Sequence, residues 1–282
     1  MKVIKGLEVA FEEEYSNLSL AFYKLHGIRE GFLSGGNAQL KKEKFLDSLI
    51  KNLDAEAIEK GVYFLENSIK SATSGYVSQN IKATIGYRFI TGMGYPSPVE
   101  NGMLFHHVYG VPYIHGESVK GLVRYVYLLE NFPDMFEEPE NFRYKIKDLE
   151  EGEYKEDEDL QNEYSLIFGN KKCEGSIIFF DAYPTKLTKD NLVIDIMNPH
   201  YGEYYKSQGK NPALDWDKPN PIFFLTLEGV EFCFTVGFDP MRLDEEKGKE
   251  KLGKVVSCLR GGLEMFGLGG KRRKGYGWFE VV

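Results

Sequence analysis

The residues with the clearest chemistry lie near the C-terminus, in the segment GLGGKRRKGYG that covers residues 267–277. Five of its eleven residues are glycine, which lets the backbone approach a ligand closely and adopt positive φ angles. Successive N–H groups in such a turn can bind an anion, and four adjacent cations supply charge for phosphates. The alternative is a solvated basic turn whose glycines only end a helix. We predict that a nucleic-acid backbone is bound here, with one aromatic ring for stacking, by Gly269, Gly270, Lys271, Arg272, Arg273, Lys274, Gly275, Tyr276 and Gly277.

A second basic pattern lies at the start of an expected helix, in the segment YIHGESVKGLVR of residues 113–124. Lys120 and Arg124 are four residues apart, so they share one face of that helix. The N-terminus of a helix adds a partial positive charge, which favours bound phosphate. We predict that Lys120 and Arg124 flank the same phosphate-binding groove as the loop. The alternative is that both simply solvate the outer face of the helix.

A third segment, from Asn198 to Pro221, interleaves aromatic residues with Lys206 and Lys210. Such a segment can stack unpaired bases. It can equally form an ordered loop that its own aromatic side chains fold over the core. Of these two alternatives, the ordered loop is the one we expect.

Catalytic chemistry has weaker support. Asp181 and Asp195 lie at or within apolar, strand-like runs, and neither has a second carboxylate at metal-ligand spacing. The three cysteines form no CxxC or Cys/His pattern, so neither a zinc site nor a disulfide framework is indicated. We expect no catalytic residue, no bound metal and no cofactor. The alternative is a metal-independent ribonuclease that uses imidazole as general acid or base, drawn from His106, His107, His115 and His200.

The charge of the chain is unevenly distributed. The net charge is −8, but residues 134–163 contain 13 acidic and 4 basic residues, a local charge of −9, so the rest carries −8 − (−9) = +1. We interpret the acidic stretch as a solvated insertion that leaves room for a basic surface elsewhere. No apolar run approaches the roughly 18 residues that span a membrane. The acidic start of the chain lacks the apolar run of a signal peptide, so we expect a cytoplasmic protein.

Hydrophobic periodicity predicts the elements that position these motifs. Residues 37–72 have the spacing of two helices, with Asp54 as an N-cap between them. Residues 81–89 alternate apolar and polar positions, which predicts a half-buried strand with Tyr87 on its buried face. A glycine- and proline-rich loop follows from Thr91 to Val111; its length and lack of period favour a functional role.

The later segments complete an α+β pattern. They predict a helix, three apolar stretches of strand, a strongly periodic helix and a short last strand, at residues 117–130, 176–184, 192–197, 221–239, 252–266 and 278–282. Without the additions, this is the βαββαβ order of ferredoxin-like and RNA-recognition (RRM-like) folds. The third apolar stretch is expected to be two strands joined by a tight turn at Glu228 and Gly229.

We expect one compact unit with two parts. Residues 1–75 would form a mainly helical N-terminal addition packed on the core. Residues 76–282 would form the ferredoxin-like domain, interrupted by the acidic insertion at about 134–163.

Together, these motifs resemble the RAMP superfamily of CRISPR-associated proteins. That family has a G-x-G-rich basic loop near its C-terminus, seen here as GLGGKRRKGYG, and a PxIPGSSxKGxxR-like stretch, seen here as VPYIHGESVKGLVR. His115 stands where proline is usual and Glu117 where serine is usual. The later segments GSIIFFDAYP, DIMNPHYGEYY and DWDKPNPIFFLTL are similar to one subgroup, found in the Cmr, or type III-B, effector complex. The resemblance runs from about residue 80 to the C-terminus.

The resemblance implies a non-catalytic structural subunit that binds CRISPR RNA. Its partners would be CRISPR RNA, target RNA and the other RAMP subunits of the Cmr complex, without a membrane. The loop from Thr91 to Val111 would project to a neighbouring subunit or to the guide–target duplex. Two alternatives stay open: a metal-independent CRISPR-RNA-processing endoribonuclease of the wider superfamily, and an assembly protein whose basic loop binds an acidic partner.

Overall fold

The computed structural model describes residues 15–24, 42–97, 99–214, 216 and 219–282. They divide into two compact units, and the boundary between the units falls within a helix, α3 (Ala55–Ala72). Unit 1 contains the described residues of 1–61, 90–112 and 187–228, and unit 2 contains residues 62–89, 113–186 and 229–282. We expected the boundary at residue 75. Two segments of the expected domain 76–282, residues 90–112 and 187–228, instead group with the N-terminal helices.

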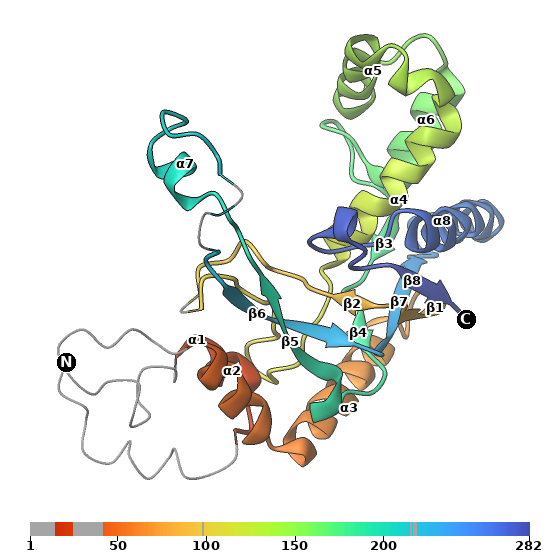
Figure 1. Cartoon of the computed structure of the whole chain (residues 1–282). Helices are drawn as coiled ribbons and strands as arrows, with labels where there is room; N and C mark the ends of the chain where they lie inside the picture. Colours follow the sequence, from red (N-terminus) through yellow and green to blue (C-terminus); the bar gives the residue numbers. More distant parts are fainter. Residues whose placement is uncertain (1–14, 25–41, 98, 215, 217–218) are drawn as a thin grey trace. The chain divides into compact units, whose positions relative to one another are not determined.

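Unit 2 is built on an antiparallel sheet (Figure 1). Its strand order is β3-β7-β1-β8, and β4 also pairs with β7. Every pair in this sheet is antiparallel. The strands are β1 (Val77–Ile85), β3 (Ile177–Phe179), β4 (Tyr183–Pro184), β7 (Glu231–Phe238) and β8 (Phe279–Val281). Mixed helices and antiparallel sheets confirm the α+β class.

The first strand follows the predicted alternation and then stops. Ile81, Ala83 and Ile85 are buried, as expected for one face of β1. The N–H of Gly86 donates to the carbonyl of Trp278, and β1 ends there. Tyr87 is 49% exposed, so the predicted continuous strand to residue 89 is wrong at this point. Only a short strand, β2 (Arg88–Phe89), follows.

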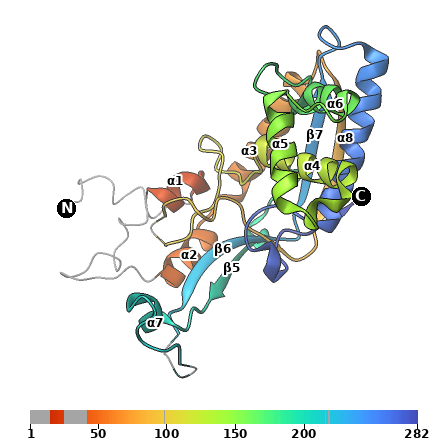
Figure 2. The same ribbon diagram turned by 90° about the horizontal axis from the view of Figure 1, so that it is seen from above.

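Two long helices pack on this sheet and on each other. The helix α8 (Glu245–Met265) contacts β1, β7 and β8, and Figure 2 shows it running alongside β7. The helix α4 (Gly116–Asn131) contacts α8 and β3. Close approach of α4 and α8 requires a small residue at Gly262, because a Cβ there would lie 2.8 Å from Leu122. The helical period predicted from Leu252 is confirmed by its buried side.

The acidic stretch folds into a helical lobe with an apolar interior. We call it the α5–α6 lobe; it comprises η2 (Pro133–Phe136), α5 (Pro139–Glu151) and α6 (Glu158–Phe168). Leu149, Tyr154 and Tyr164 are buried. The stretch therefore carries packed side chains in addition to the solvated charges that its composition predicts.

Glu163 fixes α6 to the two long helices of unit 2. Its carboxylate accepts hydrogen bonds from Lys251 and Lys254 of α8, both at 2.9 Å, and from the Tyr127 hydroxyl of α4 at 3.0 Å. The Glu163 side chain is only 19% exposed. Burial opposes ionisation of this carboxyl, but the hydrogen bonds from Lys254 and Lys251 outweigh it and hold the pKa below its ordinary value.

This contact predicts an acid-dependent loss of stability. Replacing Glu163 by Gln leaves two lysines without their carboxylate, and we expect the free energy of unfolding at neutral pH to fall by about 2 kcal/mol. A carboxyl with a depressed folded-state pKa stabilises above its unfolded pKa and loses this effect as pH falls through the folded value. The difference between wild type and E163Q should therefore shrink below the ordinary carboxyl pKa of 4.5.

Urea unfolding across a pH series measures this difference. The matched control is Glu264→Gln, because Glu264 lies exposed on α8. The control should change stability by less than about 0.5 kcal/mol at every pH. A constant difference between wild type and E163Q from neutral to acid pH would contradict the assignment.

Unit 1 contains the N-terminal helices and a separate strand pair. Its helices are α1 (Leu18–Tyr23), α2 (Lys42–Lys51) and the start of α3; its strands are β5 (Leu192–Met197) and β6 (Ile222–Glu228), which pair antiparallel. The N-cap predicted at Asp54 is confirmed, because its side chain accepts from the N–H of Ala57 at 3.1 Å. Residues 37–41 of the first predicted helix lie outside the described residues.

Glu228 and Gly229 join two strands, β6 and β7, as predicted, but these strands do not pair with each other. β6 pairs with β5, whereas β7 pairs with β1, β3 and β4. Gly229 takes a φ of +64° at the turn, so the tight turn exists but redirects the chain into a different sheet. Local sequence predicts the turn; the choice of strand partner depends on contacts distant in the chain.

The aromatic segment between β5 and β6 includes the short helix α7 (Gly202–Lys206). Tyr205 is 68% exposed and Trp216 is 78% exposed. The expected ordered loop, folded over the core by its own aromatic side chains, is therefore wrong for these two rings. Residues 215, 217 and 218 lie outside the described residues.

Candidate nucleic-acid interface

The predicted glycine-rich segment forms a loop that is pinned at its base. The N–H of Leu268 donates to the carbonyl of Gly277 at 2.9 Å, and the N–H of Gly277 donates to the carbonyl of Arg88 at 2.7 Å. Gly277 has a φ of +73°, and a Cβ there would lie 1.8 Å from the Leu268 oxygen. Only glycine fits this crossing of two backbones. These hydrogen bonds close a small loop, residues 269–275, which we call the basic loop.

The basic loop has left-handed residues on either side of a single turn. Lys271 and Gly275 are left-handed, with φ of 58° and 88°, on either side of a single turn, η4 (Arg272–Lys274). In the part of the chain that the structure describes, the N–H groups of Gly269, Gly270, Arg272 and Arg273 donate no hydrogen bond. N–H groups without an acceptor, next to left-handed residues, can form an anion-binding concavity.

The charge lies on the same loop. The side chains of Arg272, Arg273 and Lys274 are exposed, and Lys271 is half-buried. Three exposed cations on a loop where several N–H groups have no acceptor among the described residues suit a polyanion better than a single small ligand, since each cation can meet a separate phosphate.

A groove runs between the basic loop and α4. It has a volume of about 530 Å³. On one side are Ser118, Gly121 and Tyr125 of α4; on the other are Gly269 and Arg272. A Cβ at Gly121 would meet nothing within 4 Å, so the helix surface is open there. The loop and the first core helix therefore meet, as the sequence predicts, and small residues of α4 line the gap between them.

Lys120 and Arg124 lie on a different face of α4. The Lys120 ammonium donates to the carbonyl of Phe168 at 2.7 Å, and burial, with help from the nearby Arg124 charge, lowers the pKa of Lys120. Arg124 pairs with Glu150 at 2.6 Å and donates to the Tyr164 hydroxyl at 3.4 Å. In this structure both cations tie α4 to the α5–α6 lobe, and neither lines the groove.

The aromatic surface beside the loop differs from the predicted one. Tyr276 is 8% exposed, and its ring packs edge-on against Tyr87 with centroids 5.7 Å apart. A buried ring cannot stack on a base. Tyr87 is exposed instead, with the Arg88 guanidinium 5.3 Å from its ring centroid, and Trp278 is 39% exposed. Sequence reasoning missed Tyr87 because strand alternation assigned it to the buried face.

The start of α4 is anchored by Asp181. The Gly116 N–H donates to the Asp181 carboxylate at 2.7 Å. A Cβ at Gly116 would lie 2.2 Å from the Phe179 oxygen, so glycine is needed where the helix meets this strand. Asp181 thus stabilises a helix N-terminus. Among the described residues, no group of three or more His, Cys, Asp or Glu side chains could hold a metal ion.

Three of the candidate histidines, His106, His107 and His115, have structural surroundings, whereas His200 is exposed. His115 precedes α4, with Nδ1 3.9 Å from Asp181 and Nε2 3.4 Å from the Tyr113 hydroxyl. In unit 1, His106 stacks on His107 and on Tyr109, with centroids 5.6 and 5.1 Å apart. The His106 N–H donates to the Val111 carbonyl at 2.8 Å and helps to shape the turn.

We predict that His115→Pro is tolerated. His115 has φ −59° and ψ 137°, which proline adopts without strain. The preceding residue, Ile114, pairs with Ala182 in a β-bridge, and extended backbone suits a residue before proline. The melting temperature should stay within a few degrees of wild type, which differential scanning fluorimetry measures.

His115→Ala is the companion variant. Target cleavage by a reconstituted complex should be nearly unchanged by it, because a general base normally contributes about a hundredfold or more in rate. A loss of that size, with RNA binding intact, would contradict the non-catalytic assignment.

Comparison with known proteins identifies the family of this chain. Residues 82–280 match the model of the RAMP superfamily, and the chain belongs to that superfamily. It is 33% identical over 249 residues to the CRISPR system Cmr subunit Cmr6 of Pyrococcus furiosus, a match that covers 75% of this chain and 68% of the relative. It is 27% identical over 183 residues to the Cmr6 subunit of Saccharolobus solfataricus, covering 64% of this chain and 49% of that one.

A solved structure shares the fold. A chain of the cryo-EM structure of the type III-B Cmr-beta complex bound to cognate target RNA matches with a TM-score of 0.59 and 22% sequence identity. The match covers 86% of this chain and 71% of that chain. None of the helices in the described part of this chain is both long and apolar enough to cross a membrane.

Proposed function

We propose that this chain is a structural, RNA-binding subunit of a type III-B (Cmr) effector complex, and that its basic loop binds the RNA backbone. The observation that carries the proposal is the basic loop itself. Arg272, Arg273 and Lys274 are exposed on a loop that is closed at Gly277, and several backbone N–H groups of this loop donate no hydrogen bond in the described structure. The Cmr6 name of the relatives in Pyrococcus furiosus and Saccharolobus solfataricus supports the complex to which the chain would belong.

The chemistry of the site favours recognition of the backbone without a sequence preference. Cations and N–H groups contact phosphates, which every nucleotide carries. The exposed rings of Tyr87 and Trp278 beside the loop add stacking that tolerates any base. A subunit that must accept guides of many sequences needs this kind of contact. The groove along Ser118 and Gly121 would extend the path of the strand over α4.

The strand order supports a ferredoxin-like core in unit 2. Along the chain, β1, α4, β3, β7, α8 and β8 follow one another once the additions are set aside. Their order in the sheet is β8-β1-β7-β3, with all pairs antiparallel. A split βαβ arrangement of this kind places the end of the second helix and the last strand at one edge. The basic loop joins those two elements.

The partners follow from the same assignment. CRISPR RNA and target RNA would be the nucleic acids, and the other RAMP subunits of the Cmr complex would be the protein neighbours. The relatives named Cmr6 support a place among the subunits of a Cmr complex, and a chain of a Cmr-beta complex bound to cognate target RNA shares the fold.

We propose that the chain does not itself cleave RNA. His115 and His106 are engaged in turns and a helix start, and Asp181 stabilises a helix N-terminus. No observation favours the endoribonuclease alternative over this assignment. The acidic-partner alternative is less well supported, because the exposed rings of Tyr87 and Trp278 beside the loop suit RNA.

RNA binding by the full chain and by the reconstituted complex, with and without magnesium, separates the three functions. The structural role predicts a stable complex with intact RNA under both conditions. Cut RNA ends with the full chain alone would support the endoribonuclease, and no RNA contact in the complex would support the assembly protein.

A further inference from the structure

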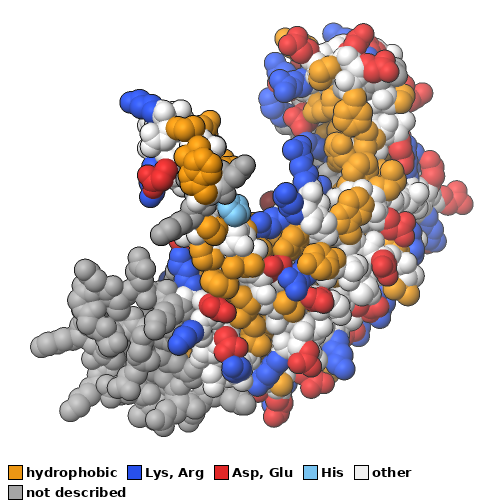
Figure 3. All heavy atoms as spheres, in the orientation of Figure 1, with side chains coloured by type: hydrophobic (Ala, Val, Ile, Leu, Met, Phe, Trp, Pro, Cys, Tyr) orange, Lys and Arg blue, Asp and Glu red, His pale blue; other side chains and the backbone are white. Residues whose placement is uncertain are grey.

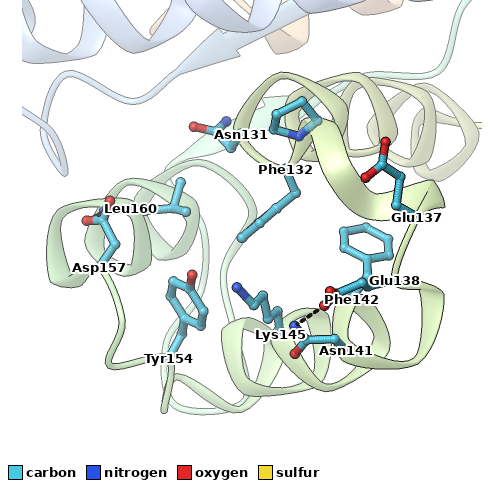
Figure 4. Close-up of a pocket in the computed structure, with 11 residues that line it drawn as sticks. Asn131, Phe132, Glu137, Glu138, Asn141, Phe142, Lys145, Tyr154, Asp157 and Leu160 are labelled. Carbon is cyan, nitrogen blue, oxygen red and sulfur yellow. Dashed lines mark hydrogen bonds between the residues drawn. The ribbon is translucent and has the colours of Figure 1, made fainter.

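The α5–α6 lobe contains a cavity that is not part of the proposed RNA site (Figure 4). Its volume is about 430 Å³, and it opens between η2, α5 and α6. Its wall combines three aromatic rings with three carboxylates: Phe132, Phe142, Tyr154, Glu137, Glu138 and Asp157. An aromatic interior with an acidic rim is a combination that selects cations.

The rings form a rigid frame. Phe132 packs edge-on against Phe142 and against Tyr154, each with centroids 5.9 Å apart. Figure 4 shows the three rings arranged around one space, with Glu137 at one end and Asp157 at the other. Tyr154 is 7% exposed, so the frame is part of the packed lobe.

One positive charge, the Lys145 ammonium, already lies beside the aromatic rings of the cavity. The Lys145 ammonium lies 5.8 Å from the Phe132 ring centroid and pairs with Glu156 at 2.7 Å. The hydrogen bond to Glu156 raises the pKa of Lys145, so this amine stays charged. Lys145 lines the cavity as well, but its charge is neutralised by Glu156, a carboxylate outside the cavity wall. Glu138 and Asp157 accept hydrogen bonds from neutral groups, the Asn141 amide and the Leu160 N–H, and these contacts do not neutralise their charge.

The surroundings point to a protein partner. The lobe sequence from 134 to 163 has 13 acidic and 4 basic residues, a field that repels RNA and attracts a basic segment. Hydrophobic side chains gather over the lobe among charged ones (Figure 3). Phe136 and Tyr144 are 69% and 68% exposed on η2 and α5, and aromatic rings are enriched in protein interfaces.

We propose that this cavity receives an arginine side chain from a basic segment of a neighbouring protein subunit. A guanidinium stacks on aromatic rings and pairs with carboxylates in two directions at once, which a lysine ammonium cannot do. Such buried arginine anchors commonly dominate the energy of an interface. This inference rests on the proposed role in a multi-subunit complex, but it concerns a surface separate from the basic loop.

Photo-crosslinking in the reconstituted complex tests the inference. The full chain carries p-benzoylphenylalanine in place of Phe136, and adducts are identified by mass spectrometry. We expect an adduct with another protein subunit, at a peptide that contains arginine. Charge reversal of the rim, Glu137→Lys with Glu138→Lys, should reduce the adduct yield about tenfold or more.

The matched control reverses two other carboxylates of the same lobe, Glu140→Lys in α5 with Glu158→Lys in α6, which are exposed and do not line the cavity. It should leave the yield unchanged. Glu137→Gln is the milder variant, because it changes one exposed side chain outside α5, and we expect it to fold. It should also lower the adduct yield.

An adduct with RNA or with a second copy of this chain, or a yield that the rim variants leave at the wild-type level, would overturn the inference alone. Failure of the wild-type chain to join the complex would overturn the proposed function and the inference together. The salt dependence of RNA binding tests the basic loop independently of both results.

Discussion

Replacing Arg272, Arg273 and Lys274 by alanine should weaken binding of single-stranded RNA about tenfold or more, and by the same factor for every RNA sequence. Each side chain is exposed on the basic loop. If each releases counterions from one phosphate, the slope of log affinity against log salt should become shallower by about 2, because each contact contributes about 0.7 on a single strand. Filter binding of the full chain across a salt series measures both quantities.

The control for this variant removes the same charge elsewhere in unit 2. Arg143, Lys147 and Lys247 are exposed on α5 and α8. Their replacement by alanine changes the net charge equally but should leave the salt slope near the wild-type value. An unchanged slope in the loop variant, or an equal change in both, would remove the basic loop from the RNA site.

Gly277→Ala should be the most disruptive single substitution of the site. The left-handed φ of +73° already costs an alanine about 1–2 kcal/mol. The Cβ would also lie 1.8 Å from the Leu268 oxygen, so the two backbones must separate and break their hydrogen bond. We expect the free energy of unfolding to fall by about 3 kcal/mol or more, with loss of RNA binding in the fraction that stays folded.

Gly275→Ala is the matched comparison. Gly275 has a φ of +88°, but a Cβ there meets nothing within 4 Å. It should cost only about 1–2 kcal/mol, from the backbone conformation alone. Chemical unfolding of both variants separates the two effects; equal costs would mean that the crossing of Leu268 and Gly277 does not hold the loop.

Local sequence patterns were sufficient for the elements that support the site. The period of residues 252–266 predicted α8, and the alternation from Ile81 to Ile85 predicted β1, because both patterns reflect burial on one face. The glycine-rich basic segment also marked the loop, since positive φ and close backbone approach leave few alternatives to glycine.

The rest depends on contacts between distant segments. Lys120 and Arg124 share a helix face as predicted, but the partners of that face, Phe168 and Glu150, belong to the α5–α6 lobe. No local pattern indicates that those helices fold back against α4. A distant contact also explains why Tyr87 is exposed and not buried as predicted. The N–H of Gly86 donates to the carbonyl of Trp278, and the strand ends before it reaches Tyr87.

The sequence pattern also could not predict the division into two units. The strand pair β5–β6 looked like part of the core because LVIDIM and IFFLTL are apolar runs. Its residues instead contact α2 of unit 1. Apolar runs show that a strand is buried, but they do not identify the core in which it is buried.

The most direct test of the RNA site is ultraviolet crosslinking of guide RNA to this chain in the reconstituted complex, with the crosslinked peptides identified by mass spectrometry. We predict that the main crosslinks fall at the basic loop and at the exposed rings beside it, Tyr87 and Trp278. The guide RNA should be recovered uncut. Crosslinks confined to other surfaces, with none at residues 269–278 or Tyr87, would contradict the assignment of the basic loop as the RNA site.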